Sequence, residues 1–256
     1  MVTIICAVAL GASLLTFFSG FGLGTLLLPA FAAFFPVDAA VAMTAVVHFA
    51  NNVFKLALVG RRADVKVVAR FGLPAIAASF IGAKVLLSLT ALPVLSSYEA
   101  WGRTFHVTWI NLVIAMLMLA FAALEAFPSA AGKSFDPKYL PLGGALSGFF
   151  GGLSGHQGAF RSAFLVRCGL DQQAFIATGI VVACLVDATR LTVYASRASS
   201  AAVAGNLPLL AAAMASAFLG AWLGARLIKK VTILTIQRLI ACLLVLFALS
   251  LAAGLV

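Results

Sequence analysis

Ten apolar segments follow one another along the chain, separated by short polar or glycine-containing stretches. Eight of them are predicted to be long transmembrane helices, since a helix needs about 20 apolar residues to cross the hydrocarbon core of a bilayer. The other two, 22–35 and 157–168, would extend over only about 18–21 Å as helix, so each is predicted to be a half-span or one arm of a re-entrant hairpin. This pattern predicts an all-α polytopic membrane protein, with segments at 2–19, 22–35, 38–60, 66–89, 107–127, 139–152, 157–168, 171–196, 201–227 and 231–254.

The composition agrees with this pattern. Hydrophobic residues make up 64% of the chain and charged residues only 9%, against the roughly 25% charged residues of a soluble domain. No stretch is left for a separate soluble domain, so 1–256 is predicted to be one membrane transporter domain, multi-pass in the cell (inner) membrane. The first apolar run lacks the basic start of a cleavable signal peptide and is expected to be a retained span.

The second half of the chain resembles the first. A glycine-rich stretch, Gly20–Gly24, precedes the first short segment as Gly151–Gly158 precedes the second. Further along, Lys55-Leu56 in the third segment matches Arg190-Leu191 in the eighth. We therefore predict two homologous repeats, 1–127 and 139–256, joined by a linker at 128–138. Short, glycine-interrupted segments at matching positions of two halves are typical of the binding site of a secondary transporter.

Basic residues cluster in three loops and help to choose a topology. If both short segments cross the membrane, all three loops lie on one side, as the positive-inside rule asks, the two repeats are inverted and both termini lie outside. If the short segments re-enter instead, eight full spans remain and the third loop lies opposite the first two. We favour crossing, with the re-entrant arrangement as the alternative; the loops contain Arg61, Arg62, Lys66 and Arg70, then Lys133 and Lys138, then Arg226, Lys229, Lys230 and Arg238.

The stretch Phe149–Arg161 is predicted to be broken backbone at membrane depth. Four glycines within eight positions free the chain to turn and to expose amide groups. Such a break is tolerated in a bilayer only inside protein or beside water, and it would place His156, Gln157 and Arg161 at the site. The alternative is a close helix contact, since Gly144, Gly148 and Gly152 are spaced four apart.

A polar stripe lies on the third segment. His48, Asn51, Asn52 and Lys55 fall at i, i+3, i+4 and i+7, which puts them on one helical face. Ionisable and polar groups inside a span are costly and usually face the bundle interior. The stripe therefore indicates a substrate or ion path, although Lys55 alone could extend to the interface.

The matching eighth segment contains Asp187 and Arg190 at i, i+3, close enough to pair. A structural ion pair between them is one interpretation. The other makes Asp187 the first candidate for proton coupling and His48 the second, because an imidazole titrates near physiological pH.

Cationic and donor groups outnumber the single carboxylate near the predicted centre, so the site is expected to bind an anion. Half-helices that start near Gly24 and Gly158 would add the positive ends of their dipoles. Arg161, with its planar fork of donors, is predicted to be the main anion contact and His156 and Gln157 its partners. The predicted substrate-binding residues are Gly22, Gly24, His48, Asn51, Asn52, Lys55, Gly155, His156, Gln157, Arg161, Asp187 and Arg190.

These features resemble the sulfite exporter TauE/SafE family of membrane transporters. The resemblance rests on the whole-length duplication, on the glycine-rich breaks, and on the string Ser147–Phe164 followed by Phe175–Gly179, which is similar to one subgroup of that family. It implies transport of sulfur-containing anions such as sulfite and organosulfonates. The chain departs from the commoner family pattern at His156-Gln157-Gly158 and Arg161, where many members have a glycine run.

Two other classes of function were compared with transport. A membrane enzyme would need a nucleophile–base or metal constellation, and the three histidines and four cysteines show no such spacing, so no catalytic residue, metal or cofactor is expected. A structural or assembly subunit is the remaining alternative. The expected partners are a small anionic solute and the lipid bilayer, with a homodimer left open, and no nucleic acid is implied, because the formal charge of +10 fits basic loops of a membrane protein.

Overall fold

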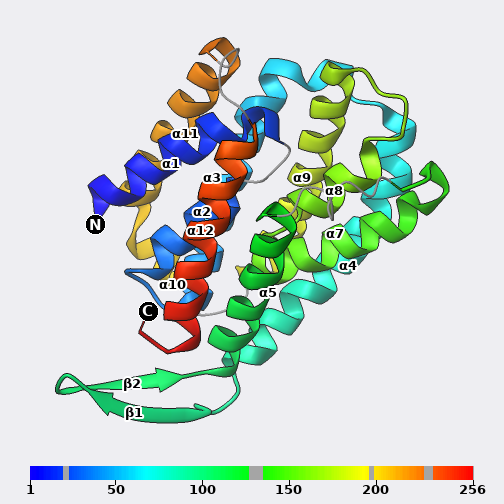
Figure 1. The fold of residues 1–256 in the computed structure, drawn as a ribbon. Helices are drawn as coiled ribbons and strands as arrows, with labels where there is room; N and C mark the ends of the chain where they lie inside the picture. The colour runs from blue at the N-terminus through cyan, green and yellow to red at the C-terminus, as the bar shows by residue number, and fades with distance from the viewer. Residues whose placement is uncertain (20–22, 127–134, 196–198, 228–232, 256) are drawn as a thin grey trace.

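The structure, a computed structural model, describes residues 1–19, 23–126, 135–195, 199–227 and 233–255. It is a bundle of α-helices with one two-stranded hairpin at its end (Figure 1). The helices are α1 (Val2–Ser19), α2 (Gly24–Ala32), α3 (Val37–Val59), α4 (Val65–Thr90), α5 (Trp109–Ala126), α7 (Leu140–Ser154), α8 (Gly158–Leu165), α9 (Gln172–Tyr194), α10 (Ser199–Gly205), α11 (Leu207–Leu227) and α12 (Ile233–Ala252). Two 3₁₀ turns lie at Gly60–Arg62 and Pro137–Tyr139.

Four of these helices are long and apolar enough to cross a membrane, judged over the described ranges: α3, α4, α9 and α11. Helices α1, α5 and α12 contain shorter apolar stretches. The two segments predicted to be short are the helices α2 and α8, of 9 and 8 residues. The chain is thus a helical protein with several candidate spans, and eight full spans remain a prediction.

The segment predicted at 201–227 is wrong as a single helix. Helix α10 ends at Gly205 and α11 begins at Leu207. Pro208 accounts for the interruption, since proline lacks the N–H that a helix interior needs and is accommodated in the first turn of a new helix.

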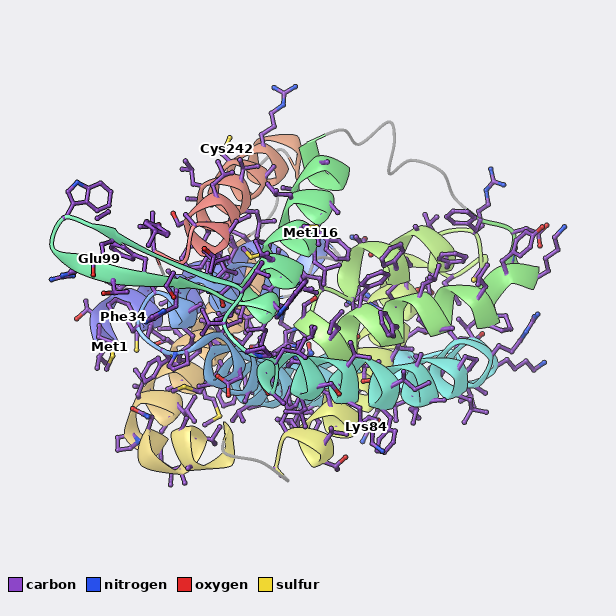
Figure 2. The ribbon with its side chains drawn as sticks, turned by 90° about the horizontal axis from the view of Figure 1, so that it is seen from below. Met1, Phe34, Lys84, Glu99, Met116 and Cys242 are labelled. Atoms are coloured by element: carbon purple, nitrogen blue, oxygen red, sulfur yellow. The ribbon has the colours of Figure 1, made fainter. Side chains whose placement is uncertain are left out.

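Apolar side chains cover the outside of the bundle. Leu73 on α4, Met116 on α5 and Leu246 on α12 are each more than 60% exposed. Figure 2 shows Met116 and Cys242 at the periphery of the helices. Polar groups such as Asn51, Gln157 and Asp187 are instead fully buried. An apolar exterior around a polar interior suits a protein whose surroundings are lipid.

Helices α4 and α7 cross so closely that their backbones touch. A Cβ atom added at Gly144, Gly148 or Gly152 would lie 2.1 Å from a carbonyl oxygen of α4. Helix α7 runs unbroken through Gly151 and Gly152 to Ser154. The prediction of broken backbone over Phe149–Arg161 is therefore wrong in extent: the glycines spaced four apart serve the helix contact, and the break is confined to residues 155–157.

The main helix contacts pair the first half of the chain with the second. Helix α1 packs on α11 and α4 on α7, while α3 packs on α9 and α5 on α12. Figure 1 shows α1 beside α11 at one side of the bundle and α4 beside α7 at the other. The interior of the molecule is therefore built by elements far apart in sequence.

A hairpin that the sequence did not predict joins α4 to α5. Strand β1 (Ser96–Ala100) pairs antiparallel with β2 (Arg103–Val107). The turn, Trp101-Gly102, has φ values of 50° and 71°. The hairpin lies against the C-terminal end of the chain (Figure 1), where the Tyr98 hydroxyl donates to the Ala253 carbonyl at 2.6 Å. This contact fixes the hairpin and the end of α12 at the same end of the bundle.

Candidate functional site

The break between α7 and α8 depends on the backbone conformation of one glycine. Gly155 has φ 84°, in the left-handed region, and its N–H donates to the Gly151 carbonyl at 3.0 Å. Helix α8 then begins at Gly158, and its N-cap residue Gln157 makes no side-chain capping bond. Helix α2 begins in the same way, at Gly24 with no side-chain cap from Leu23.

The start of α2 lies beside the break between α7 and α8. A Cβ at Gly24 would be 3.7 Å from the carbonyl oxygen of Gly155 and 3.6 Å from the Thr44 Cγ2 atom on α3. The structure therefore brings the predicted site residues Gly24 and Gly155 together. Gly22, also predicted for the site, lies outside the described residues.

The polar stripe of α3 faces the interior. His48, Asn51, Asn52 and Lys55 are each at most 5% exposed. Lys55 thus does not extend to the interface. Asn51 Oδ1 accepts from the Ser13 hydroxyl of α1 at 3.2 Å, which connects the stripe on α3 to α1.

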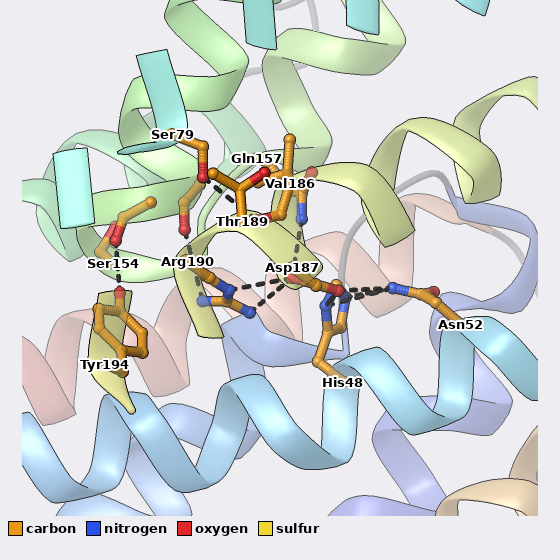
Figure 3. Close-up of polar contacts among 12 residues, drawn as sticks. His48, Asn52, Ser79, Ser154, Gln157, Val186, Asp187, Thr189, Arg190 and Tyr194 are labelled. Atoms are coloured by element: carbon orange, nitrogen blue, oxygen red, sulfur yellow. Dashed lines mark hydrogen bonds and ion pairs between the residues drawn. The ribbon is translucent and has the colours of Figure 1, made fainter. Parts of the chain in front are cut away.

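Asp187 on α9 lies at the centre of the polar cluster (Figure 3). Its Oδ2 contacts His48 Nδ1 at 2.6 Å and accepts from Asn52 Nδ2 at 3.1 Å. Its Oδ1 accepts from Arg190 Nε at 3.0 Å and from Gln157 Nε2 at 3.3 Å, and the Arg190 Nη2 atom lies 2.8 Å from it as an ion-pair contact. A fully buried carboxylate is tolerated when donors surround it in this way. One side chain thereby joins α3, α9 and the break.

Arg190, a predicted site residue, also binds other groups of the protein interior. Besides pairing with Asp187, it donates from Nη1 to the Gly151 carbonyl at 3.4 Å. A Cβ at Gly155 would lie 2.8 Å from the same Nη1 atom. One turn further on, the Tyr194 hydroxyl donates to the Gly152 carbonyl. The end of α7 is thus held by α9, as the ion-pair interpretation of Asp187 and Arg190 requires.

The three polar residues of the predicted break point in different directions. Gln157 reaches Asp187, whereas the His156 ring stacks on Phe121 with centroids 5.0 Å apart. His156 Nδ1 contacts the Ser154 hydroxyl at 3.1 Å. Arg161 runs along α9, where a Cβ at Gly179 would be 3.2 Å from its Nε atom. The structure therefore does not gather His156, Gln157 and Arg161 around one point.

Some buried polar atoms have no hydrogen-bond partner among the described residues. They include Thr44 Oγ1, Asn51 Nδ2, His156 Nε2 and Gln157 Oε1, on side chains at most 3% exposed. Buried groups of this kind are normally satisfied by protein, water or a ligand. Thr44 was missed by the sequence reasoning, although it lies one turn before His48 and continues the stripe.

The arrangement offers hydrogen-bond donors and helix starts rather than a reaction centre. Within the part of the chain that the structure describes, no group of three or more His, Cys, Asp or Glu side chains is placed to hold a metal ion. Unpartnered amide and hydroxyl donors beside two helix N-termini can bind an anion by hydrogen bonding.

Comparisons with known proteins identify the family of the chain. No curated protein and no solved structure matches it. The family model described as Sulfite exporter TauE/SafE matches residues 5–251, and the chain belongs to this family of membrane transporters.

Proposed function

We propose that this chain is a secondary transporter that moves a small sulfur-containing oxyanion, such as sulfite or an organosulfonate, across the cell (inner) membrane. Its family is one of membrane transporters and not of enzymes. The observation on which the proposal depends is the contact between Gly24, where α2 starts, and Gly155, in the break just before α8, inside a buried and donor-rich cluster.

The charge and geometry at this place favour an anion. The first amides of a helix have no intrahelical acceptor, and the helix dipole makes that end positive. Two such ends lie together here, and neither has a side-chain cap. Thr44 Oγ1 and Asn51 Nδ2, on the neighbouring face of α3, are donors that the described protein does not satisfy. A bound oxyanion would accept from these groups and would replace the water that a buried polar site otherwise needs.

The helix packing supports two inverted repeats, 1–127 and 139–256, around the linker 128–138. Exchanging the halves maps the α1–α11 contact onto the α7–α4 contact and leaves the α3–α9 and α5–α12 contacts in place. Asn52 and Asp187, each three positions before the matching Lys55 and Arg190, bond to each other across the α3–α9 contact. Repeats related in this way are the usual basis of alternating access, with the substrate bound where they meet.

Uptake of labelled anions into proteoliposomes tests the proposal. Sulfite and an organosulfonate should be taken up, and a carboxylate of similar size should be taken up more slowly. Thr44→Val keeps the shape of the side chain and removes one unpartnered donor, so apparent affinity should fall roughly 5- to 30-fold, about 1–2 kcal/mol.

The matched control is Thr192→Val on the exposed face of α9, where the hydroxyl donates only to the Thr189 carbonyl. Uptake by this variant should equal that of the parent. If the parent protein transports no oxyanion, the proposed function is wrong. If it does and both threonine variants behave alike, the proposed site is wrong.

A further inference from the structure

The interior contains a buried contact between a histidine and a carboxylate that the anion site does not account for. His48 and Asp187 lie 139 positions apart in the chain and are joined at 2.6 Å. Both are at most 3% exposed. We propose that this His48–Asp187 pair binds the proton that is transported with the anion, one proton for each anion; the inference rests on the proposed transport function.

The hydrogen bonds define where the proton is added. His48 Nδ1 faces Asp187 Oδ2 and must therefore be the protonated ring nitrogen when Asp187 is ionised. The other nitrogen, Nε2, then has the lone pair that can accept a proton; Asn52 Nδ2 lies 3.4 Å from Nε2 and 3.2 Å from Nδ1. Protonation adds a hydrogen at Nε2 and turns the imidazole into an imidazolium, while the Nδ1 contact to Asp187 becomes an ion pair. No bond between heavy atoms forms or breaks.

The summed charge of His48, Asp187 and Arg190 explains why the two ligands would bind together. The buried Lys55 adds positive charge nearby. With neutral His48, ionised Asp187 and cationic Arg190, these three side chains sum to zero. Adding one proton gives the group a net charge of one positive unit. A net charge buried at membrane depth is costly unless a counter-charge is close. An anion at the Gly24–Gly155 break would supply this counter-charge, since Arg190 Nη1 lies only 2.8 Å from the position that a Cβ atom would take at Gly155.

Coupling of this kind is reciprocal: the anion raises the affinity for the proton by the factor by which the proton raises the affinity for the anion.

Other titratable groups also lie near the His48–Asp187 pair, and the test must distinguish their protons from those bound by the pair. They lie on α3, α8 and α9: Lys55, Arg161, Cys184, Arg190 and Tyr194. His156, in the break, lies near Arg190.

The position of the pair links the proton to movement of the helices. Asp187 contacts α3 through His48 and Asn52, and the break through Gln157. A positive charge on His48 strengthens its interaction with Asp187 Oδ2 and repels the Asn52 amide group, which lies within 3.4 Å of both ring nitrogens. Protonation therefore changes the strength of the contacts between α3 and α9, where the two proposed repeats meet.

Proton uptake on anion binding tests the inference. Methanesulfonate is the probe, because its own charge does not change near neutral pH, so any proton taken up belongs to the protein. Purified protein in weakly buffered detergent solution should take up about one proton per bound anion near pH 7. In proteoliposomes, an acidic exterior should drive accumulation of the anion, and each anion should enter with about one proton.

His48→Asn keeps a donor near the position of Nδ1 and removes the titrating ring, so the ratio of protons to anions should fall to zero whatever the rate of transport. The control is His106→Asn on the exposed hairpin, where His106 Nδ1 contacts only Ser97 Oγ; its ratio should stay at one. If His48→Asn fails to insert, the ratio is measured on Asp187→Asn instead, where it should also fall to zero. Its control is Asp171→Asn, because Asp171 is the N-cap residue of α9 and asparagine caps a helix equally well.

The outcomes separate this inference from the proposed function. If the parent protein transports no sulfonate or sulfite, the proposed function fails. If it transports them without proton movement, or if His48→Asn keeps a ratio of one, the anion site stands and the proton site is overturned.

Discussion

Single residues in the core differ in whether their polar atoms are already paired within the protein. The polar contacts of Asp187 and Arg190 join α3, α9 and α7, and Asp187 is at the same time one half of the proposed proton site. Thr44 and Asn51 differ from them, because each keeps one buried atom without a partner among the described residues. Side chains of similar polarity thus have different roles, and substitutions should reveal them.

Gly155→Ala should impair transport more than the backbone strain alone explains. Alanine at φ 84° is strained by roughly 1–2 kcal/mol, and its Cβ would also lie 2.8 Å from Arg190 Nη1. We expect a loss of thermal stability together with at least a tenfold loss of uptake rate, measured by unfolding in detergent and by proteoliposome uptake.

Gly169→Ala separates the two effects, since Gly169 has φ 69° but no atom within 4 Å of its added Cβ. It should lose similar stability and keep its transport rate. Equal transport by the two variants would mean that the break has no part in the site.

Arg161→Lys and Arg161→Gln test the cation predicted to contact the anion. Lysine keeps the charge and removes the planar fork, so a bidentate contact predicts reduced affinity, while a purely electrostatic role predicts little change. Arg161→Gln should cost about 2–5 kcal/mol, at least roughly 30-fold in affinity.

Gly179→Ala is the companion variant, because its Cβ would lie 3.2 Å from Arg161 Nε and shift the guanidinium without changing any charge. It should lower affinity less than Arg161→Gln. Parental affinity in all three variants would place Arg161 outside the anion site.

The residues of the polar cluster could be predicted from sequence only as far as the signal is local. The spacing of His48, Asn51, Asn52 and Lys55 defines one face of a helix whatever that helix packs against. The partner of His48 could not be predicted, since Asp187 is 139 positions away and the contact depends on the α3–α9 packing. The same limit explains why the stacking of the His156 ring on Phe121 could not be predicted.

Among the elements, the contact between α4 and α7 sets how closely the two halves approach. Glycines at one face of α7 let its backbone lie against the carbonyl groups of Phe71, Ala75 and Ser79 on α4. Gly82 on α4 does the same against the Phe149 carbonyl. In lipid, where no hydrophobic force drives helices together, close packing of this kind is a main source of association.

Gly148→Ala should therefore destabilise the bundle. Its Cβ would lie 2.1 Å from the Ala75 carbonyl oxygen, so the helices must separate. Overpacking typically costs about 1–3 kcal/mol and can cost more against backbone. Thermal unfolding in detergent should show a clear drop in Tm.

Gly11→Ala on α1 is the control, because no atom lies within 4 Å of its added Cβ. Its Tm should stay or rise, since glycine in a helix interior is less favourable than alanine by roughly 1 kcal/mol. A Tm for Gly148→Ala as high as the parent's would contradict the close contact.

The helices were predictable because apolar length is a strong signal, and the hairpin was not. Type I′ hairpin turns usually carry Asn-Gly or a similar pair, whereas this turn is Trp101-Gly102. The strands are also short and mostly exposed, so no alternation of apolar and polar residues marks them.

At the scale of the whole molecule, two contacts bear on whether the short helices cross the membrane. The hairpin after α4 contacts the C-terminal end of α12 through Tyr98 and Ala253. Phe135, at the end of the linker, donates its N–H to the Ala163 carbonyl near the end of α8 and stacks on Phe164. If α2 and α8 re-entered, each of these pairs would lie on opposite sides of the membrane. Both contacts therefore favour crossing and the inverted five-plus-five arrangement.

This topology predicts the side on which single cysteines are labelled. In a background without Cys6, Cys168, Cys184 and Cys242, a membrane-impermeant reagent applied to intact cells should label Glu99→Cys on the exposed hairpin (Figure 2) and Ser199→Cys at the start of α10. Ser129→Cys in the linker should be labelled only after the cells are opened, because the basic loops of the two repeats are then all cytoplasmic. The re-entrant arrangement instead puts positions 129 and 199 on the same side. Labelling of both from one side would remove the inverted repeats and, with them, the reason for placing the anion and the proton where α3 and α9 meet.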